Sequence, residues 1–95
     1  MPETFWTVRW PDGTQERLYS PSSVVAELFE PGRAYPLPEF LFRARIAMER
    51  ASDRVRRIHG RPCRLALDQL DAIEATAARF ADREAAEVAC LEIAR

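Results

Sequence analysis

The chain has 95 residues, of which 47% are hydrophobic, and its formal net charge is −1 at pH 7. This length predicts a single domain covering residues 1–95. No stretch approaches the roughly 18 consecutive apolar residues of a membrane span, and the first ten residues lack the basic start and apolar run of a targeting signal. Cys63 and Cys90, the two cysteines, are expected to be free thiols. We therefore expect a cytoplasmic protein without a membrane segment.

The first predicted element is a β-hairpin. In Phe5–Trp10 apolar and polar residues alternate, which places both tryptophans on one side of a strand, facing the core. The next three residues, Pro-Asp-Gly, have typical turn chemistry. A second strand, Thr14–Tyr19, is therefore expected to pair back on the first.

A short helix and an extended segment follow the hairpin. Ser20 is a candidate N-cap, and Pro21–Phe29 has apolar residues on one helical side. Proline and glycine at positions 31 and 32 end this helix. Arg33–Leu37 is then expected to cross the surface in extended form.

The longest helical pattern runs from Pro38 to His59, and Gly60 is its expected C-terminal cap. Apolar residues recur in steps of three and four along one side and need a partner surface. They are Leu41, Ala44, Met48, Ala51, Val55 and Ile58. A second stripe is basic and consists of Arg43, Arg50, Arg54, Arg57 and, beyond the helix end, Arg61.

The last predicted elements are a helix at Leu65–Phe80 and a strand at Ala86–Ala94. The final strand is expected beside the first, whose other edge is taken by its hairpin partner. The predicted fold is therefore α+β in the order ββαααβ, with a three-stranded, mainly antiparallel sheet and the helices packed on one face.

The residues suggest no catalytic or metal site. His59 is the single histidine, and Cys63 has no further ligands at metal-binding spacing. A Cys63 nucleophile assisted by His59 ranks below a packed loop cysteine. Asp68, Asp71 and Glu74 share a helix face, but such a row is more often solvated or salt-bridged than metal-binding. We therefore expect no enzymatic activity, no cofactor and no metal.

Charge is unevenly distributed along the chain. Residues 40–64 hold eight basic and two acidic residues, whereas residues 1–39 hold three and six and residues 65–95 three and seven. The basic stripe is therefore a candidate face for a protein partner or an anion, after the simpler interpretation of a solvated or internally paired face. Nucleic acid ranks third, because no recognised binding motif accompanies the arginines. A second candidate contact is the proline-bounded aromatic loop around Phe29, Tyr35 and Phe40.

Several segments, in this order and spacing, resemble a small bacterial nitrogen-starvation-response family encoded in nitrilase-containing gene clusters. They are TVRWPDG, YSPSSVV, FEPGRAYPLPEFLFRAR and ALDQLDAIEA. The resemblance implies a cytoplasmic protein made under nitrogen limitation that works with products of the cluster, among them the nitrilase, a radical-SAM protein, an acetyltransferase-like protein and a flavin oxidoreductase. The implied task of the cluster is assimilation of nitrile or cyanide nitrogen. The resemblance carries over no catalytic residues.

Together these observations predict a non-enzymatic accessory or regulatory protein of the nitrogen-starvation response. It would bind a protein partner from the same gene cluster or a second copy of itself. The alternative is a nucleic-acid-binding regulator that uses the arginine face of the long helix. A small-molecule binder or minor enzyme using Cys63 and His59 is a third hypothesis.

Overall fold

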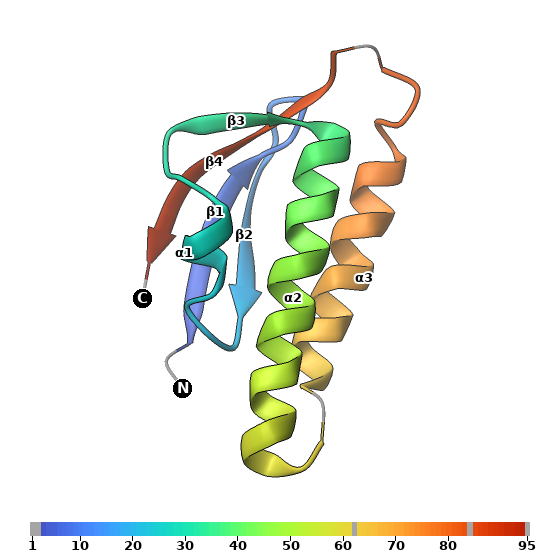
Figure 1. Cartoon of the computed structure of the whole chain (residues 1–95). Helices are drawn as coiled ribbons and strands as arrows, with labels where there is room; N and C mark the ends of the chain where they lie inside the picture. The colour runs from blue at the N-terminus through green and yellow to red at the C-terminus, as the bar shows by residue number, and fades with distance from the viewer. Residues whose placement is uncertain (1–2, 62, 84, 95) are drawn as a thin grey trace.

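The computed structural model of the protein describes residues 3–61, 63–83 and 85–94. Within these residues the fold is α+β, with elements in the order ββαβααβ. The elements are β1 (Thr4–Arg9), β2 (Gln15–Ser20), α1 (Val25–Leu28), β3 (Arg33–Pro36), α2 (Leu37–His59), α3 (Arg64–Ala78) and β4 (Glu87–Ala94). Figure 1 shows α2 and α3 side by side as a helical hairpin against the sheet.

The four strands form one antiparallel sheet in the order β2-β1-β4-β3. The predicted hairpin of β1 and β2 and the predicted position of the last strand beside the first are both confirmed. The register of β1 against β4 shifts after Thr7, so that Leu91 has no counterpart on β1. Such a bulge strengthens the local twist of the strand pair.

The prediction of three strands in the order ββαααβ is wrong, because Arg33–Pro36 forms a fourth strand on the edge of the sheet. The sequence predicts that this segment crosses the surface in extended form. In the structure it lies antiparallel to β4, and the N–H of Gly32 donates to the Cys90 carbonyl over 2.7 Å. An extended segment next to a sheet edge satisfies its backbone groups by pairing, and the proline at its end is tolerated there.

The segment before β3 contains less helix than the sequence predicts. The helix α1 has four residues and begins only at Val25. The Ser20 hydroxyl donates to the Ser22 carbonyl and accepts from the Ser22 N–H, so these residues form a local turn before the helix. Serine hydroxyls often form such local bonds in competition with helical turns.

The long helix is confirmed, with a start at Leu37 and an end at His59. Gly60 has a φ of 80° and donates its N–H to the Arg56 carbonyl, which is the expected left-handed cap. The predicted apolar stripe is buried at Ala44, Met48 and Ala51, where α2 lies on the sheet. The small side chains of Ala44 and Ala51 allow a close approach of the helix, and Met48 fills the space between them.

An aromatic core lies between the sheet and the helices. Trp6, Val8 and Trp10 of the β1 region are buried, as predicted. Trp6 packs on Phe29, and Trp10 packs on Phe40 and Phe80. On the outer edge of the sheet, the N–H of Tyr19 in β2 donates to Gln69 Oε1 of α3 over 2.9 Å. Among the described residues, none of the helices combines the length and the apolar character needed to cross a bilayer.

Candidate interaction surface

The long helix reaches past the sheet that supports it. At about 1.5 Å per residue, the 23 residues of α2 span roughly 35 Å. The six residues of β1 span only about 20 Å. Figure 1 accordingly shows the C-terminal end of α2 well beyond the ends of β1 and β2. The last turn of α2, residues 56–59, is therefore exposed to solvent.

This projecting end is basic and partly apolar. Residues 54–64 include five arginines and no acidic residue. Two large aliphatic side chains lie among them, Ile58 and Leu65, each 62% exposed. We call this surface the basic hairpin end and define it as Arg50, Arg54, Arg57, Arg61 and Arg64 with Ile58 and Leu65.

The carboxylates of the chain neutralise this surface only in part. The carboxylate oxygens of Asp53 lie 2.8 Å from Arg56 Nη2 and 3.7 Å from Arg57 Nη2. Glu27 Oε2 of α1 lies 3.6 Å from Arg54 Nη2. All of these side chains are about half exposed or more, and ion pairs in such positions contribute at most about 1 kcal/mol. The pairs are therefore easily exchanged for contacts with a partner.

Three of the predicted arginines lie together around a shallow hollow. Arg50, Arg54 and Arg57 line it with Asp53, and its volume is about 280 Å³. Within the described residues Arg50, Arg61 and Arg64 form no ion pair. Successive turns of α2 thus present guanidinium groups with unused donors on one side of the helix.

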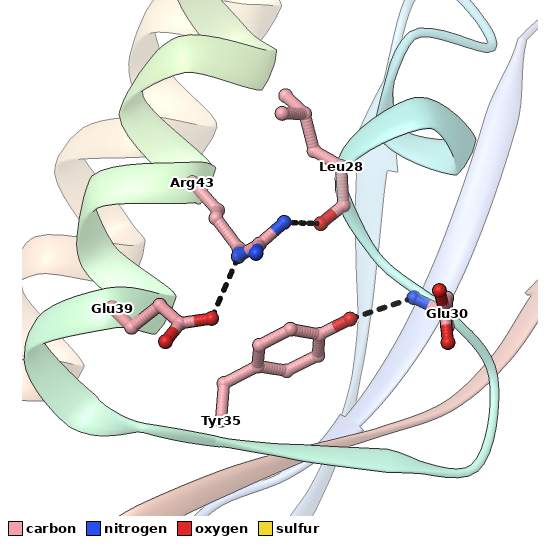
Figure 2. Close-up of polar contacts among 5 residues, drawn as sticks. All are labelled: Leu28, Glu30, Tyr35, Glu39 and Arg43. Atoms are coloured by element: carbon pink, nitrogen blue, oxygen red, sulfur yellow. Dashed lines mark hydrogen bonds and ion pairs between the residues drawn. The ribbon is translucent and has the colours of Figure 1, made fainter.

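Arg43, the first residue of the predicted basic stripe, forms contacts within the fold and lies outside the basic hairpin end. Figure 2 shows its guanidinium between two oxygen acceptors: Nε donates to Glu39 Oε2 over 2.9 Å and Nη1 to the Leu28 carbonyl over 2.8 Å. The same group lies 5.1 Å from the centroid of the Tyr35 ring. Arg43 therefore ties α2 to the end of α1 and to β3, with two of its five N–H donors used in these contacts.

The predicted aromatic contact at Phe29, Tyr35 and Phe40 is corrected by the structure. All three rings are at most 1% exposed. Phe29 packs on Tyr35, on Phe40 and on Trp6, and the Tyr35 hydroxyl accepts a hydrogen bond from the Glu30 N–H. These rings belong to the core because the β3 segment joins the sheet and covers them.

Sequence reasoning missed the exposed apolar residues. The sequence pattern places Ile58 in the apolar stripe of the long helix and Leu65 at the start of the following helix. Phe42, two positions after the buried Phe40, is 64% exposed. The signal for Ile58 was present in the sequence, because a helix of more than 20 residues cannot lie entirely on strands of six.

The remaining candidates for chemistry are not assembled into a site. His59 is exposed at the end of α2, and no hydrogen bond joins it to Cys63 within the described residues. The Cys63 N–H donates to Ser52 Oγ over 3.2 Å. Burial, with smaller effects of the nearby Cys63 and Glu3, raises the pKa of Tyr19. No group of three histidine, cysteine, aspartate or glutamate side chains in the described part of the chain is arranged to hold a metal ion.

The two cysteines should differ in reactivity. Cys63 is partly exposed, whereas Cys90 is fully buried and burial raises the pKa of its thiol to about 11. Iodoacetamide at about pH 8 should therefore modify Cys63 in the folded protein and leave Cys90 intact, because the thiolate is the reactive form. Peptide mass spectrometry measures both sites, and both should react in denaturant. Equal rates of modification of the two cysteines in the folded protein would show that the sheet opens around Cys90.

Comparison with known proteins identifies a family. The sequence model of the family described as "Nitrogen starvation-induced protein NitG" matches residues 5–93. The match runs from β1 through β4 and includes both the α2–α3 hairpin and the sheet. Searches of the curated proteins and of the solved structures give no match. Because the family match covers nearly the whole chain, the protein belongs to the NitG family of nitrogen starvation-induced proteins.

Proposed function

We propose that this protein is a non-enzymatic accessory protein of the nitrogen-starvation response that binds an acidic surface of another protein through its basic hairpin end. The partner is a product of the same nitrilase-containing gene cluster. One observation carries the proposal: the basic hairpin end combines solvent-exposed arginines, whose ion pairs are weak, with the exposed aliphatic side chains of Ile58 and Leu65. Arginine and large apolar groups are the residues that typically dominate protein interfaces.

The apolar residues favour a protein over a nucleic acid as the partner. Phosphate contacts need only the basic groups, and an exposed Ile58 or Leu65 contributes nothing to them. A protein partner can bury both side chains while its carboxylates pair with the surrounding arginines. A nucleic-acid-binding regulator remains the competing hypothesis, since residues 54–64 carry five arginines and no acidic residue.

Charge reversal at the hairpin end tests the proposal. The double variant Arg54→Glu and Arg57→Glu should weaken binding to purified cluster products on the order of tenfold at low salt, because it replaces two attractive charges by two repulsive ones. Biolayer interferometry with each partner gives the dissociation constant. The matched control is Arg9→Glu with Arg79→Glu, which changes the net charge equally at exposed positions outside the surface. Equal binding by both double variants and the natural sequence would refute the assigned surface.

Truncation of the apolar residues separates the two partner classes. Ile58→Ala with Leu65→Ala keeps every charge, so it should weaken protein binding and leave any binding to duplex DNA or RNA unchanged. Fluorescence anisotropy with labelled nucleic acid, at low and moderate salt, measures the second quantity. Tight, strongly salt-dependent nucleic-acid binding that is insensitive to the double alanine variant would favour the regulator hypothesis instead.

A further inference from the structure

A second surface feature lies at the other end of α2, away from the basic hairpin end. Between the first turns of α2 and residues 81, 83, 85 and 86 there is a pocket of about 510 Å³ that is open to solvent. Leu37 and Leu41 of α2 form one wall, and Ala85 and Ala86 form part of the other. We call it the α2–β4 pocket. Its volume falls within the range of roughly 300 to 1,000 Å³ that small-molecule sites occupy.

Backbone geometry keeps this pocket open. The N–H of Leu37 donates to the Ala86 carbonyl over 2.9 Å, so the start of α2 is fixed to the start of β4. Ala85 has a φ of 56°, a left-handed conformation that non-glycine residues adopt uncommonly. The chain turns there before β4 begins, and alanine side chains at positions 81, 85 and 86 leave the space between the walls unfilled.

Each wall of the pocket carries one arginine. On one wall, Arg45 Nη2 lies 3.6 Å from Glu74 Oε2, a distance that is too long for a hydrogen bond. Both side chains of this ion pair are about half exposed. Arg83 of the opposite wall has its guanidinium 5.1 Å from the centroid of the Phe80 ring. Neither side chain donates a hydrogen bond within the described residues. The positive end of the α2 dipole lies at the same place and adds to the potential.

From these observations we infer that the α2–β4 pocket binds a small organic carboxylate. Its apolar body would lie against Leu37 and Leu41, and its carboxylate would accept hydrogen bonds from Arg45 and Arg83. A purely polar anion such as phosphate would leave the leucine wall uncovered, and a neutral apolar molecule would leave both guanidinium groups without an acceptor. The combination selects for a molecule with one anionic head and an apolar body.

Phenylacetate and its neutral analogue phenylacetamide are suitable probes, because they share an apolar body and differ in charge. A titration of ¹⁵N-labelled protein followed by heteronuclear NMR should show saturable shifts for phenylacetate centred on the amides of Leu41, Ala81 and Ala86. Phenylacetamide should bind roughly tenfold more weakly, since it lacks the charge-assisted hydrogen bonds. Arg45→Gln and Arg83→Gln should each weaken phenylacetate binding by a similar factor and reduce the difference between acid and amide.

Arg50→Gln is the matched control, because Arg50 is exposed on the same helix but lies at the basic hairpin end. It should leave phenylacetate binding unchanged. The same spectra report whether each variant is folded. Three outcomes would overturn the inference: no saturable shifts with phenylacetate or hexanoate at about 10 mM, shifts centred elsewhere, or equal affinities for the natural sequence and both glutamine variants.

Discussion

Replacing Phe40 with alanine should lower the free energy of unfolding by about 3 to 5 kcal/mol. The ring is fully buried, and its centroid lies 5.4 Å from Phe29, 5.5 Å from Trp10 and 5.9 Å from Trp6. These neighbours come from β1, from the following turn and from the end of α1, so Phe40 fixes α2 to three parts of the chain. Truncation removes its buried apolar surface and leaves a cavity in the middle of the aromatic core.

Phe42 provides the control two residues away on the same helix. Because its side chain is 64% exposed, Phe42→Ala should change the free energy of unfolding by no more than about 0.5 kcal/mol. Urea denaturation followed by tryptophan fluorescence measures both variants, since Trp6 and Trp10 are both buried in this core. A similar loss in the two variants would mean that α2 is rotated about its axis relative to the structure described above.

Periodicity predicted the elements that have strong local patterns. The alternation from Phe5 to Trp10 predicted β1 and its buried side, and steps of three and four predicted α2. The segment Arg33–Pro36 has only four residues and no alternation of its own, and its pairing depends on the distant β4. Local sequence patterns contain no information about such a partner. The missing fourth strand and the changed element order therefore have the same cause.

The candidate surface was predicted in part for a related reason. Spacing along a helix shows which side chains share a face, but not which part of that face the rest of the fold covers. Arg43 and Arg54 share a stripe, yet the first lies beside the Leu28 carbonyl and the second lies close to the projecting end. Ile58 is exposed because the helix is longer than the strands that support it. The α2–β4 pocket depends on the left-handed backbone conformation of Ala85. Neither is contained in periodicity alone.

Removal of the Arg43 guanidinium should cost about 2 kcal/mol of stability. Arg43→Met keeps an apolar side chain of similar length but loses the hydrogen bond to the Leu28 carbonyl, the ion pair with Glu39 and the contact with the Tyr35 ring. Most of the loss should come from the carbonyl, which is left without this donor in a partly buried position. The ion pair contributes less, because both of its side chains remain partly exposed.

Arg50→Met tests whether this effect is specific to Arg43. Arg50 lies two turns further along the same helix and forms no ion pair within the described residues, so its replacement should change stability by no more than about 0.5 kcal/mol. Arg43→Lys should recover only part of the loss, because one ammonium group lacks the planar fork that reaches two acceptors. The two variants should have the opposite effects on binding: Arg50→Met should weaken the partner complex, and Arg43→Met should leave it unchanged. If the Arg43→Met variant were fully stable but no longer bound the partner, Arg43 would have to be counted as part of the interaction surface.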